Sequence, residues 1–271
     1  MDGAGLANLF NSGFKHSHDM RIKVDNIDVT LPEDLKILLV VGPNNAGKTR
    51  FLEAIASTNV NNHVDFEGQV EVTIGNETYR KGGKSKAYIV YGIDLDWFES
   101  IIKQDDLSMA IELIRKYISD DIVNVYKADD GIHVMLKDSI NAVPLKRLGR
   151  GYMSIIYLMT LYAHFSPPDQ SKFLFLLDSI EQYPLDAILI DKFTKFLVNS
   201  NAITIATTTN AYMYNRIMIH GVSDIWDNTV MVMLLNRGKY ELLTVEEALN
   251  IGDYEDLTLF ARRMKTDNTE D

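Results

Sequence analysis

The stretch "LLVVGPNNAGKTRFLEAI", residues 38–55, decides the fold. An apolar run ends in a glycine-containing loop, and a helical pattern of apolar residues follows. The loop matches the phosphate-binding pattern G-x-x-x-x-G-K-[ST], and its defining positions are Gly42, Gly47, Lys48 and Thr49. Glycine in such a loop lets backbone N–H groups approach a phosphate without an intervening Cβ. The sequence therefore predicts a buried strand, a phosphate-binding loop and a helix, in that order.

Each part of this loop has a chemical role toward a nucleoside triphosphate. The Lys48 ammonium can reach the β- and γ-phosphates, and the Thr49 hydroxyl can coordinate Mg²⁺. The following helix directs the positive end of its dipole at the anion. A glycine turn in front of an ordinary surface helix is the alternative. The nucleotide-binding residues expected here are Gly42, Asn44, Asn45, Ala46, Gly47, Lys48, Thr49 and Arg50.

Composition narrows the class of protein. The chain has 271 residues, of which 46% are hydrophobic and 24% charged, so a sizeable core can form. It contains no cysteine, which excludes disulfides, thiolate metal sites and a cysteine nucleophile. We expect no membrane insertion, because no apolar stretch is long enough to span a bilayer. The first residues do not resemble a signal peptide, and a cytoplasmic location is therefore expected.

The net charge of −11 argues against nucleic-acid binding by the surface as a whole. One local basic cluster, "YRKGGKSK", covers residues 79–86. Its charged members are Arg80, Lys81, Lys84 and Lys86. The segment is either a hairpin tip that contacts phosphate or a solvated turn. Nucleic acid is therefore an alternative partner through this segment alone.

The first half of the chain is expected to be mainly antiparallel outside the phosphate loop. Alternating apolar and polar residues predict strands within residues 20–31 and 64–92, with turns at Gly75-Asn76 and Gly82-Gly83. Residues 94–118 have the pattern of one helix. The segment "IVNVYKADDGIHVMLKD" that follows resembles a hairpin with Asp-Gly at its turn.

Strands and helices alternate in the second half, which is typical of a parallel sheet with right-handed crossovers. Strands are expected at residues 171–178 and 202–208, helices at 185–200 and 210–220, and a closing hairpin at 229–245. The predicted fold class is α/β, a P-loop NTPase with a mostly parallel sheet flanked by helices. It carries an N-terminal antiparallel β subdomain and a small helical subdomain.

We expect residues 1–271 to form a single domain, with the helical subdomain inserted at about residues 92–165. The ends, residues 1–19 and 262–271, are polar or irregular in pattern and are predicted to be loosely ordered tails.

An acidic residue is expected to complete the Mg²⁺ shell from the end of a neighbouring buried strand. The run "FLFLLD" ends in Asp178, which fits that position. A strand that merely enters a turn is the alternative. Thr49 and Asp178 are thus the predicted metal ligands.

Three segments together resemble the soluble branch of ABC-type ATPases, the RecF/SMC-like and OLD-like proteins often grouped as AAA-family ATPases. They are "VGPNNAGKT", "LGRGYMSIIYL" and "ATTTNAYM", which stand where the family has its phosphate loop, signature loop and switch loop. The resemblance extends from about residue 20 to about residue 250 and implies ATP as the nucleotide. It further implies a head-to-tail homodimer on ATP binding, in which Gly149, Arg150 and Gly151 contact the nucleotide of the other subunit.

The sequence departs from this family at the hydrolytic positions. Where the family has a glutamate directly after the strand aspartate, this chain has Ser179, and Glu181 follows two residues later. In an extended chain Glu181 would lie about 6.6 Å too far along, so it can substitute only if the backbone bends after Asp178. The switch histidine of the family is matched by Thr209 or Asn210, neither of which carries charge.

The function predicted from these features is an ATP-dependent dimerising switch that hydrolyses ATP slowly, with Glu181 and Asp178 as the catalytic residues. Its expected setting is a DNA-associated or defence-type process with a separate effector protein. Two alternatives remain open at this point. The chain is either a non-catalytic ATP-binding regulatory module or the nucleotide-binding subunit of a transporter.

Overall fold

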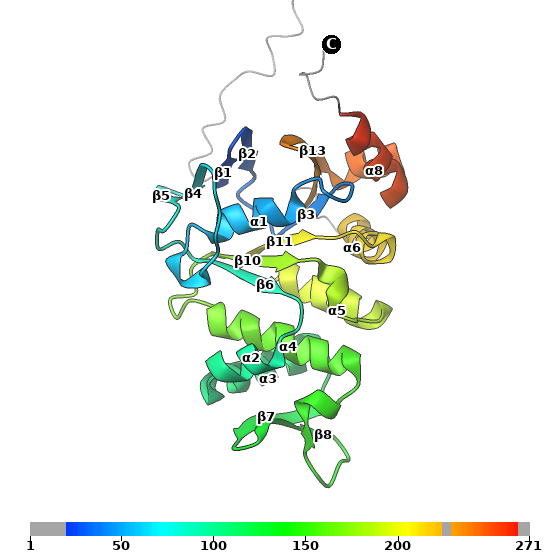
Figure 1. Cartoon of the computed structure of the whole chain (residues 1–271). Coiled ribbons are helices and arrows are strands. Elements are labelled where there is room, and N and C mark those ends of the chain that lie inside the picture. The colour runs from blue at the N-terminus through cyan, green and yellow to red at the C-terminus, as the bar shows by residue number, and fades with distance from the viewer. Residues whose placement is uncertain (1–19, 224–228, 265–271) are drawn as a thin grey trace, which may run out of the picture.

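A six-stranded sheet forms the centre of the computed structural model, which describes residues 20–223 and 229–264 (Figure 1). The strand order is β13-β12-β3-β11-β10-β6. All neighbours are parallel except β13, which pairs antiparallel with β12 at one edge. The strands are β3 Ile37–Val41, β6 Ala87–Tyr91, β10 Phe173–Asp178, β11 Ala202–Thr207, β12 Val230–Asn236 and β13 Lys239–Thr244. The predicted mostly parallel sheet is confirmed.

Strand β3 is the apolar run of the opening stretch, and its residues are buried on both faces of the sheet. Ile37, Leu39 and Val41 enter one hydrophobic core. Leu38 and Val40 enter a second core on the opposite face. The two cores cover both faces of β3, and β11 and β12 pair with both of its edges. No position of this strand therefore reaches water. A continuous apolar run is the sequence pattern of such a strand.

Helices and a second sheet cover the two faces (Figure 1). The second core lies between the main sheet, helix α1 (Lys48–Ala56) and an antiparallel sheet of order β2-β1-β4-β5. That sheet is the predicted antiparallel subdomain, with strands β1 Met20–Val24, β2 Ile27–Leu31, β4 Val70–Ile74 and β5 Glu77–Arg80. On the other face pack α4 Arg150–Phe165, α5 Ala187–Val198 and α6 Ala211–Ser223.

Strand β6 corrects one expectation. The antiparallel pairing predicted throughout residues 64–92 is wrong for β6, which pairs in parallel with β10 at the edge of the main sheet. The turn at Gly75-Asn76 does join β4 to β5, whereas the chain after Gly82-Gly83 crosses to the main sheet. Side chains from both faces of β6 are buried, as in a parallel strand rather than a half-exposed antiparallel one.

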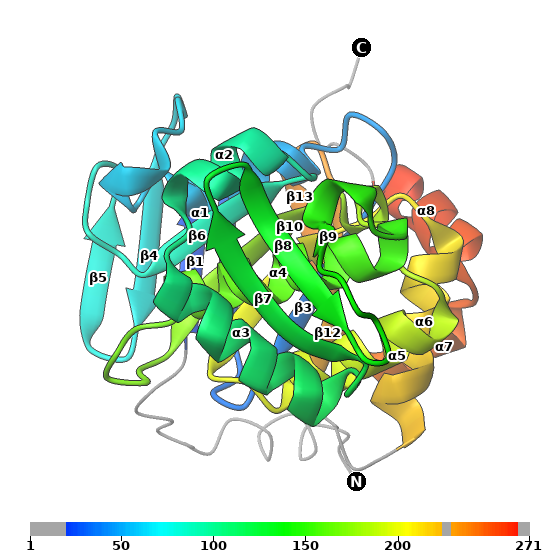
Figure 2. The ribbon, with the colours of Figure 1, turned by 90° about the horizontal axis from the view of Figure 1, so that it is seen from below.

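The insertion between β6 and β10 contains the hairpin predicted from the sequence as well as helices. Its elements are α2 Leu95–Ile101, α3 Gln104–Tyr117, β7 Ile122–Ala128, β8 Gly131–Leu136, β9 Val143–Pro144 and α4. Figure 2 shows β7 and β8 in front, with α3 beside them and α4 behind. The single helix expected at residues 94–118 is wrong, because Ile102 and Lys103 are extended. The Lys103 N–H donates to the Asp106 carboxylate at 2.8 Å and starts a new helix there.

Two further helices follow the closing hairpin, α7 (Val245–Ile251) and α8 (Tyr254–Arg263). The sequence-based expectation missed both, although Thr244 and Glu247 form a capping box in front of α7. The predicted C-terminal tail is wrong at residues 262 and 263, which belong to α8. The remainder of that tail from residue 265, and the expected tail at 1–19, lie outside the described residues. Over residues 20–223 and 229–264, every helix is too short or too polar to traverse a bilayer.

Candidate nucleotide-binding site

The candidate site lies at the carboxyl ends of β3, β11 and β10, where the loops after three adjacent parallel strands meet. The loop at residues 42–47 follows β3, residues 179–182 follow β10, and residues 208–210 follow β11. Ligands of open parallel sheets bind in crevices at this edge. The fold thus brings the loop at residues 42–47 together with two segments that lie more than a hundred residues later in the sequence.

The phosphate loop takes its shape from its glycines and from its contact with β12. A Cβ added at Gly42 would lie 2.1 Å from the Leu235 carbonyl oxygen, so only glycine fits beside that strand. Gly47 has a φ of 94° and Asn45 a φ of 63°, both in the left-handed region. The Arg237 N–H donates to the Ala46 carbonyl at 2.9 Å and holds the loop against the β12–β13 turn.

Lys48 lies inside the loop rather than on the surface. It is 9% exposed, and its ammonium donates to the carbonyls of Gly42 at 2.8 Å and Pro43 at 3.0 Å. Burial lowers the pKa of Lys48, while the carboxylates of Glu181 and Asp178 oppose that shift. The N-terminus of α1 has no side-chain cap and no acidic residue in its first turn. Its free N–H groups and this ammonium therefore suit an anion.

Asp178 is held by hydroxyl groups from two neighbouring elements. The Thr49 hydroxyl donates at 3.1 Å, and the Thr207 hydroxyl at the end of β11 donates at 2.8 Å. Thr207 in turn accepts the Ser179 N–H at 2.7 Å, which fixes the start of the next loop. A carboxylate beside a hydroxyl at a phosphate loop is a donor set that suits Mg²⁺, which usually keeps several waters and phosphate oxygens as its other ligands.

Asp178→Asn is expected to remove most of the Mg²⁺ dependence of ATP binding, with a loss of about tenfold or more in the Mg²⁺-dependent affinity. The amide keeps the shape of the side chain but not the charge of the carboxylate. Calorimetric titration of ATP with and without Mg²⁺ measures the difference. Asp28→Asn, which alters an exposed ion pair with Arg21, is the matched control. Equal Mg²⁺ dependence in wild type and Asp178→Asn would contradict the metal role.

The backbone bends directly after β10, as the proposed role of Glu181 requires. Ser179 has a φ of 54°, in the left-handed region that non-glycine residues seldom occupy. A 3-10 turn, η3 (Ile180–Gln182), follows and reverses the chain. The Glu181 carboxylate then accepts hydrogen bonds from Thr208 Oγ1 at 3.0 Å and from the Thr209 N–H at 3.1 Å and hydroxyl at 2.5 Å. Glu181 is thereby fixed at the end of β11, beside the phosphate loop.

The polar residues of the switch segment after β11 have two roles, which are to hold Glu181 and to begin helix α6. Thr208 and Thr209 bind Glu181, and Tyr254 of α8 donates its hydroxyl to the Thr208 carbonyl at 3.3 Å. Asn210 accepts the Met213 N–H at 3.1 Å and begins α6. The roles of Thr207 and Thr208 were missed from the sequence, although a run of hydroxyl residues after a buried strand is a usable signal.

The signature segment lies at the start of α4. Gly149 is the residue before the helix, Arg150 is exposed, and neither makes a hydrogen bond or ion pair to the phosphate loop within the described residues. A Cβ at Gly151 would approach Leu189 Cδ1 at 3.0 Å, whereas one at Gly149 would meet nothing within 4 Å. Gly149 is therefore the more open of the two glycines.

Arg50 points away from the phosphate loop, toward the antiparallel subdomain. Its guanidinium pairs with Asp25 at 3.2 Å, donates to the Glu67 carbonyl at 2.6 Å and stacks over the Phe66 ring at 4.8 Å from the centroid. Beside it is a cavity of about 350 Å³ that adjoins the phosphate loop. Arg50, Asp25, Asn26, Asn45 and Arg237 are among its lining residues.

The basic segment 79–86 is largely engaged with the protein itself. Arg80 pairs with Glu71 at 2.9 Å, and Lys81 donates to the Phe66 carbonyl at 2.5 Å. Lys86 donates to Ser171 and pairs with Asp169 at 3.3 Å. These contacts reduce the positive charge available to a phosphate backbone.

No protein-family model matches the chain, and no curated protein matches its sequence. Solved structures do match in fold. A nucleotide-free ATP-binding cassette from an ABC transporter aligns with a TM-score of 0.56 and 10% identity over 90% of this chain and 98% of that one. The ATP binding subunit of an ABC transporter gives 0.52 and 14% identity, covering 90% of this chain and 100% of that one.

An SMC head bound to the C-winged helix domain of ScpA gives a TM-score of 0.51 and 13% identity, covering 85% of this chain and 99% of that one. The chain therefore has the fold of an ABC-type P-loop ATPase. Within that class it resembles SMC heads as well as transporter cassettes.

Proposed function

We propose that this protein binds ATP with Mg²⁺ and acts as a slowly hydrolysing, ATP-dependent dimerising switch. The observation that carries the proposal is the joining of Lys48, Thr49 and Asp178 at one edge of the sheet. The ammonium and the α1 N-terminus would bind the phosphates, and the two oxygen side chains would hold the metal. The 350 Å³ cavity beside the loop would receive the nucleoside.

Glu181 would supply the base for hydrolysis. Bound ATP brings the phosphoryl group, and the carboxylate would orient a water and accept its proton. The three hydrogen bonds from Thr208 and Thr209 occupy most of the acceptor positions of the Glu181 carboxylate, which leaves little capacity for a water molecule. Slow turnover would follow from this arrangement. The same hydrogen bonds favour one second candidate, a module that binds ATP without hydrolysing it.

Dimerisation would complete the site. Gly149 and Arg150 are exposed at the start of α4 and make no contact with the phosphate loop of their own chain. Arg150 of one subunit would meet the γ-phosphate bound by another, together with the α4 N-terminus. A separate effector, in a cytoplasmic DNA-associated or defence-type process, would respond to the dimer. The complex of an SMC head with a ScpA domain supports a protein partner by analogy.

Gly149→Asp is expected to block ATP-driven dimerisation without weakening ATP binding. The carboxylate would oppose the γ-phosphate of the other subunit, and open space around Gly149 spares the fold. Asp and Asn both suit the position before a helix, so neither variant should destabilise α4. Sedimentation velocity with and without ATP gives the mass of each protein.

Gly149→Asn is the matched control, because it has the same shape without the charge, and it should still dimerise. Equal masses for wild type with and without ATP would refute the dimer mechanism. Gly151→Asp would be a poorer test, because a Cβ at that position would lie 3.0 Å from Leu189 Cδ1.

A further inference from the structure

Strand β6 ends the main sheet, and half of its backbone groups face away from β10. The Leu174 N–H donates to the Lys86 carbonyl at 2.8 Å, which sets the phase of the β6–β10 ladder. In a parallel pair, alternate residues of one strand bond to the same neighbour. Tyr88 and Val90 therefore bond to β10, and the N–H and C=O groups of Ile89 and Tyr91 point outward.

Within residues 20–223 and 229–264, side chains cover the first part of this edge. The Ala87 carbonyl accepts hydrogen bonds from the side-chain amides of Asn59 at 3.0 Å and Asn62 at 2.8 Å. No corresponding bond to the outward backbone groups of Ile89 or Tyr91 exists among residues 20–223 and 229–264. Unpaired edges are sites where another strand can add.

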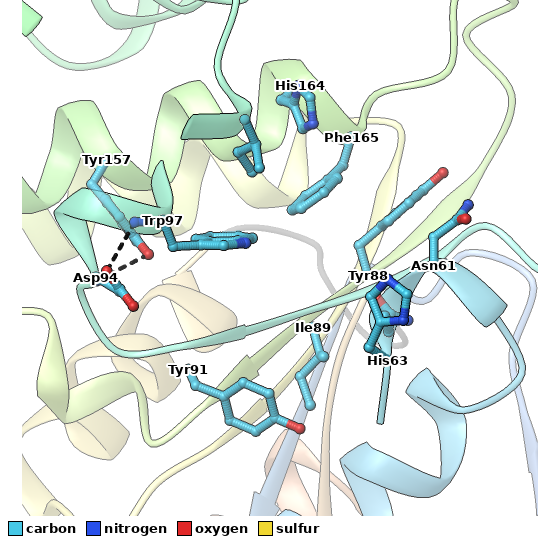
Figure 3. A pocket seen from close by; sticks show the side chains of 12 residues that line it. Asn61, His63, Tyr88, Ile89, Tyr91, Asp94, Trp97, Tyr157, His164 and Phe165 are labelled. Atoms are coloured by element: carbon cyan, nitrogen blue, oxygen red, sulfur yellow. Dashed lines mark hydrogen bonds between the residues drawn. The ribbon is translucent and has the colours of Figure 1, made fainter. Parts of the chain in front are cut away.

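A cavity of about 700 Å³ runs along the uncovered part (Figure 3). Tyr88 lines it from one face of β6, and Ile89 and Tyr91 line it from the other. Successive side chains of a strand point to opposite faces of the sheet, so a cavity that both kinds line must lie beside the edge of β6. Its opposite walls are formed by α2, the C-terminal end of α4, and the 3-10 turn η1 (Val60–Asn62) with His63.

The walls are aromatic and acidic. Trp97 is 39% exposed, and Figure 3 shows its ring between Asp94 and Phe165. Phe165 stacks on Tyr88 with centroids 4.5 Å apart, and no ring among the described residues stacks on Trp97. Asp94 begins α2, and its carboxylate is exposed next to that ring. An aromatic face beside a carboxylate is a binding environment for an ammonium or guanidinium group.

We propose that the β6 edge is a docking site for an extended segment of a separate protein. The segment adds as a strand beside Ile89 and Tyr91, with main-chain hydrogen bonds supplying affinity. It places a Lys or Arg side chain over Trp97, near Asp94. The acidic charge of α2 and the net charge of −11 favour such a basic segment over an acidic one or a second copy of this chain.

Residue-resolved hydrogen exchange tests the docking surface directly, with the full-length chain and four acetylated peptides Thr-Val-Thr-X-Thr-Val-Thr, where X is Arg, Lys, Glu or Leu. In the free protein the Ile89 and Tyr91 amides should exchange at least 100-fold faster than those of Tyr88 and Val90. The Arg and Lys peptides, at millimolar concentration, should slow Ile89 and Tyr91 at least tenfold. Tyr88 and Val90 should be unchanged.

Three outcomes overturn the proposal. One is equal protection of all four amides in the free chain, because the edge would then be covered. A second is no protection by any of the four peptides. The third is protection by the Glu or Leu peptide equal to that by the Arg peptide, because the partner would then not be basic.

Side-chain variants test the cation contact separately. Trp97→Leu keeps an apolar group but removes the ring face, so the Arg peptide should bind about fivefold more weakly and lose its advantage over the Leu peptide. Met109→Ala changes an exposed apolar residue of α3 that does not line the cavity and should have no effect. ATP binding should be unchanged in both variants, so failure here is distinguishable from failure of the proposed ATP site.

Discussion

Lys48→Ala is expected to weaken ATP binding about 100-fold. The variant removes the only ammonium held inside the phosphate loop among the described residues, where it donates to Gly42 and Pro43. Contacts to the β- and γ-phosphates would be charge-assisted hydrogen bonds, each contributing about 1.5 kcal/mol, and two of them amount to roughly a hundredfold in affinity. Calorimetric titration with ATP and Mg²⁺ measures the loss.

Lys36→Ala is the matched control for this experiment. Lys36 is another partly buried lysine that donates to a backbone carbonyl, that of Ser200 at 2.6 Å, and burial lowers its pKa as it does for Lys48. Lys36 is the last residue of the β2–β3 connection and lies at the opposite end of β3 from the phosphate loop. ATP affinity should be unchanged in Lys36→Ala. An unchanged affinity in Lys48→Ala would refute the phosphate-loop assignment.

Glu181→Gln is expected to slow ATP hydrolysis about 100-fold or more and to accumulate the ATP-bound dimer. A positioned general base contributes roughly 10²–10⁴ in rate, and glutamine cannot accept the proton. The amide still fits beside Thr208 and Thr209, so the η3 bend should persist. Single-turnover phosphate release gives the rate, and sedimentation with ATP gives the fraction of dimer.

Glu53→Gln makes the same change on α1 and should leave the rate unchanged. Among the described residues, the Glu53 carboxylate accepts one hydrogen bond, from the Tyr91 hydroxyl at 3.5 Å. Two results would contradict the assignment. Fast wild-type hydrolysis that survives Glu181→Gln means that the base lies elsewhere. Wild type without measurable turnover, with no change in the variant, supports the binding module instead.

The parts of the site that were predictable are those determined by neighbours in sequence. Strand β3 and the loop through Thr49 form one continuous segment, and Asp178 ends an apolar run that has few alternatives to a buried strand. The local sequence pattern was therefore enough to predict both the phosphate loop and the strand that ends in Asp178. The contact between Thr49 and Asp178 follows from strand order, because the ends of parallel strands meet at one edge.

The remainder depends on tertiary contacts that no local pattern encodes. The left-handed Ser179 is a conformation that its residue type does not favour, and Thr207 holds it from a neighbouring strand. Strand β6 was assigned to the wrong sheet because a five-residue apolar strand does not specify its partner. The pairing of Arg50 with Asp25, 25 positions earlier in the chain, likewise has no local sequence signal, and the role of Arg50 toward the nucleotide stays a prediction.

The strand order also has a consequence during synthesis. In the described part of the chain, strand β3 pairs with β11 and β12, and about 160 residues separate its end from the start of β11. At about 5–20 residues per second, the ribosome needs roughly ten to thirty seconds to supply that partner. Throughout this interval the apolar segment "ILLVV" lacks the two strands with which it forms hydrogen bonds in the folded protein. We therefore expect the nascent chain to bind holdase chaperones at this segment until residues 202–236 emerge.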